Sequence, residues 1–588
     1  MTVLSSIDEA YENVRRLRFG NTGTVVGDLE MSDFADALYV PDTIDDATEE
    51  FFTTSNPDGE LFIITGSAGD GKSAIFARAF TEAVDNGTEW LEEKHINLDA
   101  TASKRRNQSK IDDLNEFLEA AIEDIEAEDG PRRGLAMNLG IALNFFEKSG
   151  YNSDGKFDEI WDAIVAARDP GNLDSDGIYS GENGVTVVNL SYRPIFTTSH
   201  DPEEFASGLL RNIIDQFDYD SEETDSPFRG IEDLPDTPTE ALREPDTPYF
   251  IHNLAAFTDE TVRKRFATFV AARSLTHGQY LNPRHILAYI AQALIPDSLE
   301  QLVNETGPDA TPHDAVDNDI DPAMPLIWNG IYGNAQLENH AATLDPCAAQ
   351  SNEIDEKVLE LTGGQPIDNI DDSLTGMNEM SRLNAARTWA RAGYLRGTED
   401  IDVLSDQPVF RRFVGTIAYL DEREQTTSDQ AGTYTEEAFE KVVAALRAWS
   451  GQGTDSDWLK LDDGLPSAEY HFFAEWDDPG PDENESAILT TEETRPGTFW
   501  FKFDNGVEIP LTFRLYYLME LTSEGYNPNA LDLEGSEGVR LIRSQISRFT
   551  EKDAEIEIRA GNGSRIFNIT ARNFGSGITV EYAGDDDV

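Results

Sequence analysis

Hydrophobic positions between residues 60 and 190 form short apolar runs, and longer segments of helical periodicity separate them. Residues 111–125, for example, carry apolar side chains at intervals of three and four, as one face of a helix requires. Strands that alternate with helices are typical of a parallel α/β sheet. The predicted strands are residues 61–65, 95–98, 134–137 and 185–188.

The loop after the first predicted strand reads Gly66-Ser-Ala-Gly-Asp-Gly-Lys-Ser73, which matches the P-loop pattern. Its glycines let backbone N–H groups turn inward around a phosphate, and the helix predicted over residues 74–84 directs its positive dipole end at the anion. Lys72 is expected to bridge the β- and γ-phosphates, and the Ser73 hydroxyl to bind Mg²⁺. The sequence therefore predicts ATP and Mg²⁺ as cofactors. The expected nucleotide-binding residues are Gly66, Ser67, Ala68, Gly69, Asp70, Gly71, Lys72, Ser73, Ala74 and Arg284.

A catalytic acid is harder to assign than the P-loop. A hydrolytic P-loop protein usually ends a neighbouring strand with a carboxylate that holds Mg²⁺ and polarises water. The run at 95–98 is followed by Asp99, whereas the run at 134–137 is followed by Asn138. The order of the strands along the chain favours Asn138 for this strand-end position. An amide, however, cannot act as a base. Either Asp99 or another carboxylate contributes to catalysis beside Lys72, or turnover is slow and the site acts as a switch.

Two more polar residues are candidates for contact with the γ-phosphate. Asn189 ends the last predicted strand, where it is expected either to sense the phosphate or to form a turn. Arg284 precedes a helix predicted over residues 285–294, where it is either a second sensor or a surface arginine. The densest basic clusters are candidate DNA contacts, although surface salt bridges are the preferred interpretation. These clusters are residues 104–106, 132–133 and 263–265.

The rest of the chain changes character twice. Acidic, proline-bearing stretches separate a long helical region from a C-terminal region in which apolar and polar residues alternate with period two, as in residues 499–503. We predict four parts from this pattern. They are an N-terminal helical segment (1–50), an α/β P-loop NTPase domain with a parallel sheet flanked by helices and a helical lid (51–300), a helical domain (301–455) and a mixed C-terminal domain with β-strands (456–588).

Charge is the most unusual bulk property of the chain. The formal net charge is −68, from 113 acidic and 45 basic residues, and the acidic residues are spread along the whole sequence. Such self-repulsion destabilises a compact state in dilute buffer, but the Debye length falls to about 3 Å in molar salt. We interpret the composition as adaptation to a salt-rich cytoplasm, with an acidic surface for a basic partner as the alternative. Acidity of this origin does not exclude DNA binding through local arginines or partner subunits.

Several classes of protein are excluded. A single cysteine, Cys347, excludes internal disulfides and cysteine-rich metal sites. The sequence has no apolar run of eighteen residues and begins without a signal-peptide pattern, so we expect a cytoplasmic protein that does not span a membrane.

Short blocks of sequence, in a fixed order, resemble the ATPase subunit of DNA phosphorothioation-dependent restriction systems, the DptF family. The P-loop with its Gly-Asp-Gly-Lys-Ser ending lies within this order, and the final seventy or so residues match least well. The blocks are residues 33–40, 66–73, 96–101, 111–116, 136–140, 143–145, 188–192, 282–286, 344–346 and 525–526.

The resemblance implies a subunit of an anti-phage defence complex that restricts DNA lacking a sulfur mark in its backbone. Other subunits of the complex would be its partners, and DNA would be bound directly or through them. The strand ending Asn138-Leu-Gly140 is similar to the family's own pattern. The resemblance therefore implies that the family lacks an acidic residue at this position, and that this protein has not lost one. Two alternatives stay open: a nucleotide-gated signalling or scaffold ATPase with little turnover, and, more weakly, a P-loop kinase.

Overall fold

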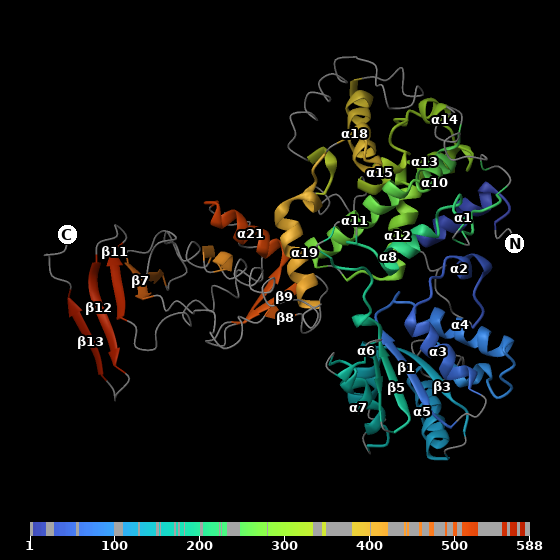
Figure 1. Cartoon of the computed structure of the whole chain (residues 1–588), viewed down its shortest axis with the longest axis horizontal. Helices are drawn as coiled ribbons and strands as arrows, with labels where there is room; N and C mark the ends of the chain where they lie inside the picture. The colour runs from blue at the N-terminus through green and yellow to red at the C-terminus, as the bar shows by residue number, and fades with distance from the viewer. Residues whose placement is uncertain are drawn as a thin grey trace. The chain divides into compact units, whose positions relative to one another are not determined.

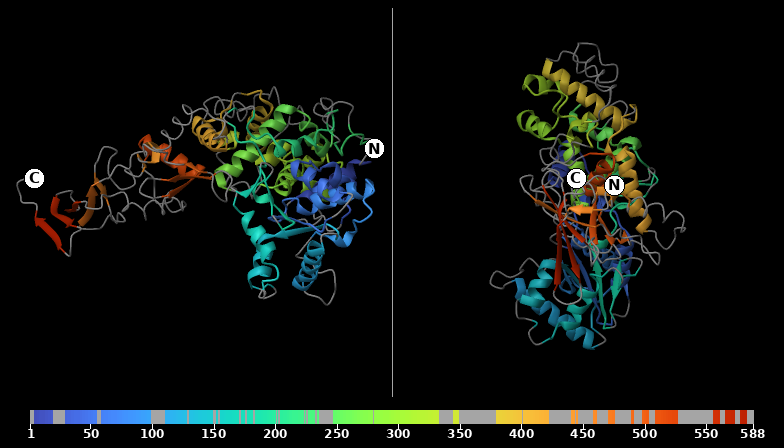
Figure 2. Two further views of the ribbon diagram at one scale, coloured as in Figure 1. Left: turned by 60° about the horizontal axis from the view of Figure 1, so that its bottom comes forward. Right: turned by 90° about the vertical axis from the view of Figure 1, so that its left-hand side faces the viewer.

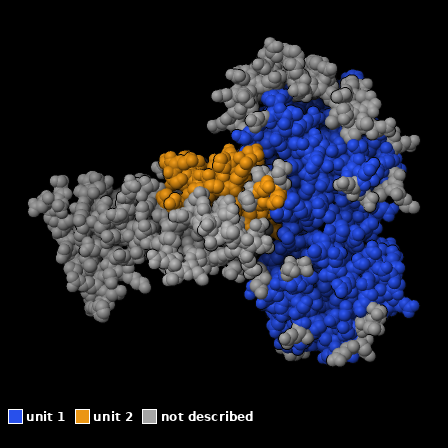
Figure 3. Space-filling view, in the orientation of Figure 1, with its two compact units in different colours: residues 1–197, 205–271, 281–403 blue, residues 198–204, 272–280, 404–588 orange. Residues whose placement is uncertain are grey.

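The architecture comes from a computed structural model of the chain (Figure 1). It describes residues 4 to 526, with gaps, and three strands between residues 555 and 582. The described chain forms two compact units (Figure 3). Unit 1 comprises Met1–Thr197, Phe205–Ala271 and Leu281–Val403, and unit 2 comprises Thr198–Glu204, Ala272–Tyr280 and Leu404–Val588. The longer gaps are residues 19–28, 99–109, 235–246, 333–343, 349–378, 422–439, 446–457, 461–469, 476–488, 491–497 and 527–554.

Unit 1 contains a mostly parallel sheet flanked by helices (Figures 1 and 2). The strands are β1 (Leu61–Gly66), β2 (Ile96–Asn97), β3 (Arg133–Asn138), β4 (Ile178–Ser180) and β5 (Val185–Asn189). The helices up to residue 215 are α1 (Ile7–Leu17), α2 (Asp33–Ala37), α3 (Thr43–Thr53), α4 (Lys72–Asp85), α5 (Lys110–Ala127), α6 (Leu139–Leu143), α7 (Asp158–Ala166) and α8 (Leu209–Asp215), with short turns η1 (Glu93–His95), η2 (Asn144–Lys148) and η4 (Leu190–Tyr192).

The strand order is β2-β3-β1-β5-β4, which puts β1 at the centre. Strands β2, β3, β1 and β5 are parallel, and β4 pairs antiparallel with β5. In this register Gly66 lies opposite Asn138 on one side, and Thr65 lies opposite Asn189 on the other. The polar residues that end β3 and β5 therefore flank the start of the loop that follows β1.

The two faces of β1 pack into separate hydrophobic cores, as its period of two requires. Leu61 and Ile63 face α5, α6 and α7, whereas Phe62 and Ile64 face α3 and α4. All four side chains are fully buried or nearly so. A strand buried on both faces reads as a continuous apolar run, which explains why the sequence predicted it clearly.

A second group of helices in unit 1 holds the helix that reaches the loop. It comprises α10 (Tyr249–Ala256), α11 (Glu260–His277, of which residues 272–277 belong to unit 2), α12 (Pro283–Leu294), α13 (Asp297–Thr306), α14 (Pro312–Asp317), α15 (Ile327–Tyr332) and α18 (Glu379–Arg396), with the turn η5 (Pro346–Ala348). Asn253 of α10 is fully buried and donates hydrogen bonds to the carbonyls of Leu294 (3.0 Å) and Pro325 (2.9 Å). These bonds fix the C-terminal end of α12 within the group.

Unit 2 contains two antiparallel sheets. The strands are β6 (Trp458–Lys460), β7 (Tyr470–Glu475), β8 (Leu489–Thr490), β9 (Thr498–Lys502), β10 (Glu508–Thr512), β11 (Glu555–Ala560), β12 (Arg565–Arg572) and β13 (Gly577–Tyr582), and the helices are η7 (Leu404–Asp406), α19 (Pro408–Asp421) and α21 (Phe513–Ser523). The strand orders are β10-β9-β8 and β13-β12-β11-β7-β6. Phe413 of α19 packs its ring against Phe499 (5.5 Å between centroids) and Phe513 (5.3 Å).

An α/β sheet flanked by helices was predicted and is confirmed, although the sheet is mostly and not entirely parallel. Its edge strand β4 was not predicted, because three residues with one buried side chain, Ile178, are too short to show an alternating pattern. The segment at 95–98 begins as a turn, and only Ile96 and Asn97 pair as a strand. The four-part division of the chain and the role of the C-terminal strands stay predictions.

Candidate nucleotide-binding site

The loop between β1 and α4 has a backbone that only glycine adopts easily. Gly69 and Gly71 have φ values of 95° and 99°, in the left-handed region. At Gly69 a β-carbon would also lie 2.9 Å from Cβ of Arg284, which is too close. At Gly66 it would lie 2.5 Å from a carboxylate oxygen of Asp70. The glycines of the motif therefore permit the turn and the close approach of two other residues.

Asp70 braces the loop from inside. Its side chain is 1% exposed, and Oδ2 accepts a hydrogen bond from the backbone N–H of Ser67. Oδ1 accepts from the side-chain amide of Asn282, which lies 3.2 Å away and also donates to the carbonyl of Ala68 (3.2 Å). The same Asn282 caps α12, because its Oδ1 accepts from the N–H of His285 (2.9 Å). One asparagine thus joins the start of α12 to the loop.

Lys72 and Ser73 open α4 at the mouth of the loop. Lys72 is buried, and its Nζ donates a hydrogen bond to the carbonyl of Ser67 (2.5 Å). The Ser73 hydroxyl donates to the carbonyl of Leu98 (3.0 Å), which keeps an oxygen lone pair available for a cation. Helix α4 has fourteen residues, and its first-turn N–H groups point toward this end of the loop. The arrangement fits a phosphate and its metal ion.

Asn138 lines the same cavity, beside the loop, at the end of β3. Asp99 lies outside the described residues. Leu98, which precedes it, directly follows β2 and accepts the hydrogen bond of Ser73. The chain therefore passes within hydrogen-bonding distance of Ser73 one residue before Asp99.

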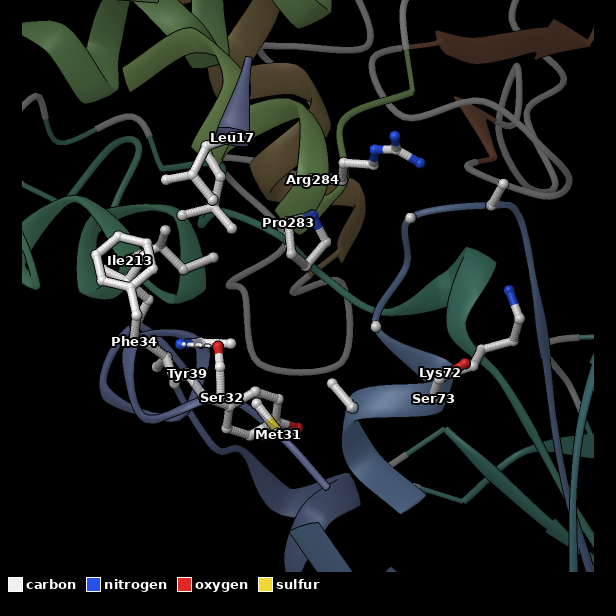
Figure 4. Close-up of a pocket in the computed structure, with 18 of the residues that line it drawn as sticks. Leu17, Met31, Ser32, Phe34, Tyr39, Lys72, Ser73, Ile213, Pro283 and Arg284 are labelled. Carbon is white, nitrogen blue, oxygen red and sulfur yellow. Dashed lines mark hydrogen bonds between the residues drawn. The ribbon is translucent and has the colours of Figure 1, made fainter. Parts of the chain in front are cut away.

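The cavity has a volume of about 390 Å³, within the range of ligand pockets. Lys72 and Ser73 form one end, and Leu17, Phe34 and Ile213 lie across the opening from them (Figure 4). Helices α1, α2, α8 and α12 supply this second, mostly apolar end. Its apolar lining residues include Leu17, Met31, Phe34, Leu38, Leu209, Ile213, Pro283 and Leu287.

Sequence reasoning missed Arg193, which directly follows the turn η4 after β5. Its side chain is only 6% exposed and lines the cavity. The Nη1 atom lies 3.9 Å from where a β-carbon of Gly71 would be, and Nε lies 2.5 Å from Oδ2 of Asp42. The sequence offered only its place as the first cation after the last predicted strand.

A polar group around Tyr39 adjoins the cavity. The Tyr39 hydroxyl donates to Oδ1 of Asp45, and the Asp42 N–H donates to Oδ2 of Asp45 (2.9 Å). Burial raises the pKa of Asp45 to about 6, against the opposing effect of these two hydrogen bonds. Burial, followed by the nearby Asp45 charge, raises the pKa of Tyr39 well above its usual range. Tyr39 itself lines the cavity.

The two candidate sensors, Asn189 and Arg284, lie in different surroundings. Asn189 is buried and forms a turn: its Oδ1 accepts from the N–H of Ser191 (3.1 Å), and its amide donates to the carbonyl of Ala167 (3.4 Å). Arg284 lines the cavity at the start of α12, and its guanidinium extends away from the apolar end (Figure 4). Its backbone N–H lies 3.4 Å from the carbonyl of Gly69.

Two of the three basic clusters serve the fold of unit 1. Arg132 pairs with Asp58 (2.8 Å) and Glu60 (2.9 Å), and Arg133 pairs with Asp124 (2.5 Å). In the cluster at residues 263–265, Arg263 pairs with Asp215 and Asp218, and Arg265 donates to the carbonyl of Tyr394. Residues 104–106 lie outside the described residues.

Within the described part of the chain, no group of three or more His, Cys, Asp or Glu side chains is placed to hold a metal ion. None of the described helices combines the length and the apolar composition that a membrane crossing requires.

Comparisons with protein-family profiles, with curated proteins and with solved structures found no match to this chain.

Proposed function

We propose that the chain binds MgATP in the cavity beside β1 and hydrolyses it to ADP and phosphate. One observation carries this proposal. The loop from Gly66 to Ser73 joins a buried central strand to the N-terminus of α4, and it opens into a cavity with cations at one end and apolar side chains at the other.

The phosphate end supplies the expected chemistry. Lys72 exchanges its bond with the Ser67 carbonyl for the β- and γ-phosphates, which are stronger partners because they are charged. The Ser73 oxygen would bind Mg²⁺ while its O–H continues to donate a hydrogen bond to the Leu98 carbonyl. Backbone N–H groups of the loop and of the first turn of α4 hold the phosphate oxygens.

The other end suits an adenine. Its apolar side chains provide a surface against which a purine ring can pack. A carboxylate is the strongest acceptor for the N1–H and the exocyclic amine of guanine, and none of the residues that line the described cavity is Asp or Glu. Asn13 and Ser32 supply neutral polar groups that can pair with the adenine edge.

Hydrolysis depends on a carboxylate near Mg²⁺. Asn138 can position a metal-bound water, but it cannot accept a proton. We infer that Asp99 is that carboxylate, because the residue before it already contacts Ser73. Asp99→Asn should therefore reduce phosphate release and leave MgATP binding intact.

A nucleotide-gated switch with little turnover is the second candidate, and the amide of Asn138 beside the loop favours it. Steady-state phosphate release with and without DNA separates the two. A motor subunit should be stimulated by DNA, whereas a switch should release little phosphate in either case.

For the biological role, we propose a subunit of a phosphorothioation-dependent restriction complex acting on unmodified DNA. The support is the order of the sequence blocks, from residues 33–40 through the P-loop to residues 282–286. Because two basic clusters are engaged in ion pairs or carbonyl contacts within unit 1, we expect DNA to be held mainly by partner subunits. The test is restriction of unmodified DNA in cells that carry Lys72→Ala: loss of restriction supports the role, and full restriction contradicts it.

A further inference from the structure

Among the arginines that line the cavity, Arg193 lies nearest to the α4 end of the loop. Its guanidinium borders Gly71, whereas Arg284 borders Gly69, and Arg16 is an exposed residue of α1. Lys72, next to Gly71, is buried as well. Two buried cations at one end of a cavity form a site for an anion of high charge.

Asp42 is the counter-ion of Arg193, and it has a second role. Its Oδ1 accepts the N–H of Ile44 (3.0 Å) and so caps α3, while Oδ2 faces the guanidinium. Although Nε lies 2.5 Å from Oδ2, it has no partner with ordinary hydrogen-bond geometry. Because a guanidinium presents several N–H donors in a planar fork, phosphate oxygens can replace the Asp42 carboxylate as its partner.

We propose that Arg193 binds the γ-phosphate and so distinguishes a nucleoside triphosphate from a diphosphate, and that Asp42 holds Arg193 when no γ-phosphate is present. The inference rests on the proposed nucleotide binding. Because a P-loop cradles the α- and β-phosphates with its backbone N–H groups, the γ-phosphate would be the group that competes with Asp42 for the guanidinium.

A change of partner at Arg193, from Asp42 to phosphate, would also affect helix α3. When Arg193 turns to the phosphate, Asp42 loses its cation at the N-terminus of α3, and its link to Tyr39 runs through Asp45. Helix α3 packs on α4 through aromatic side chains, with 6.1 Å between the ring centroids of Phe52 and Phe76. The presence of a γ-phosphate is thereby communicated to α3.

The test is calorimetric titration of the full-length chain in molar KCl with MgADP and with a non-hydrolysable MgATP analogue. For Arg193→Ala we expect analogue binding about 10- to 100-fold weaker, as for loss of a charged hydrogen bond, and MgADP binding unchanged. Arg193→Lys should lie between the two, because lysine keeps the charge without the fork. Asp42→Asn should bind the analogue more tightly and MgADP as before.

Asp46→Asn is the matched control, since Asp46 is exposed in the same first turn of α3 and does not line the cavity. It should change neither affinity. Equal weakening of both ligands by Arg193→Ala, or an unchanged ratio, overturns the inference while leaving nucleotide binding in place. If the wild-type chain binds neither ligand, the proposed function fails as well. Should Arg193→Ala not fold, Arg193→Lys and Asp42→Asn decide the question.

Discussion

The side-chain amide of Asn282 lies 3.2 Å from a carboxylate oxygen of Asp70, and this hydrogen bond joins the cap of α12 to the inside of the glycine-rich loop. Both residues are buried. Asp70 also accepts a hydrogen bond from the Ser67 N–H. The loop, Asp70 and the start of α12 therefore form one connected polar network. The shape of the glycine-rich loop therefore depends on a residue more than two hundred positions away in sequence.

Replacing Asn282 by alanine should reduce both stability and ligand binding. The change removes a helix cap and one partner of the buried Asp70 carboxylate, so we expect a loss of about 1–3 kcal/mol in the free energy of unfolding. MgATP should bind more weakly because the loop loses its brace. Thermal unfolding and calorimetry measure the two effects. Thr512→Ala removes a cap of α21 in unit 2, and should cost about 1 kcal/mol without changing nucleotide binding.

Asp99→Asn separates the two interpretations of the catalytic half of the site. If Asp99 serves Mg²⁺, phosphate release should fall by about 100-fold or more, the usual scale for loss of a general base. MgATP affinity should change little. Asp85→Asn, at the exposed end of α4, is the control for removing one carboxylate. Unchanged turnover in Asp99→Asn would assign catalysis to another group.

The free energy of unfolding should depend on pH through the Asp45 carboxyl group, at the start of α3. Its pKa is about 6 in the folded chain and about 4 when unfolded, so the folded state holds its proton more tightly. The favourable contribution is complete below pH 4 and is lost as the pH rises through 6. Wild type should therefore lose up to about 3 kcal/mol relative to Asp45→Asn over that interval.

Denaturant unfolding at pH 4, 5, 6 and 7 measures the difference. Asp46→Asn, an exposed neighbour, should show a flat difference. A difference between wild type and Asp45→Asn that is independent of pH would show that Asp45 is not protonated more readily in the folded chain.

Salt should stabilise the whole protein. A net charge of −68 repels itself over about 10 Å in 0.1 M salt, and over about 3 Å in molar salt. The midpoint of thermal unfolding should rise steadily as KCl increases from 0.1 to 2 M. A midpoint that is highest in dilute buffer would contradict the interpretation of the composition as salt adaptation.

The sequence predicted the elements that carry a local signal. The buried strand β1, the glycine-rich loop and α4 are contiguous, and their residue types follow from backbone geometry and burial. The strand end at Asn138 was placed correctly beside the loop in the sheet, although its role stays a prediction.

What the sequence could not show is what tertiary packing brings to the loop. Arg193 follows β5 by four residues, and only the strand order reveals that β5 borders β1. Asp42 and Tyr39 precede the loop by more than twenty residues and return to it through the packing of α3 on α4. The motif also could not show that the Asp70 carboxylate is turned inward and supports the loop.

The central claim is that the loop from Gly66 to Ser73 binds a nucleotide. The most direct measurement is calorimetric titration of MgATP into the full-length wild-type chain and Lys72→Ala in molar KCl, with Lys94→Ala, an exposed lysine paired to Glu92, as control. We expect saturable binding to wild type and Lys94→Ala, and affinity at least about 100-fold lower for a folded Lys72→Ala. Equal binding by all three chains, or no binding by wild type, would contradict the claim.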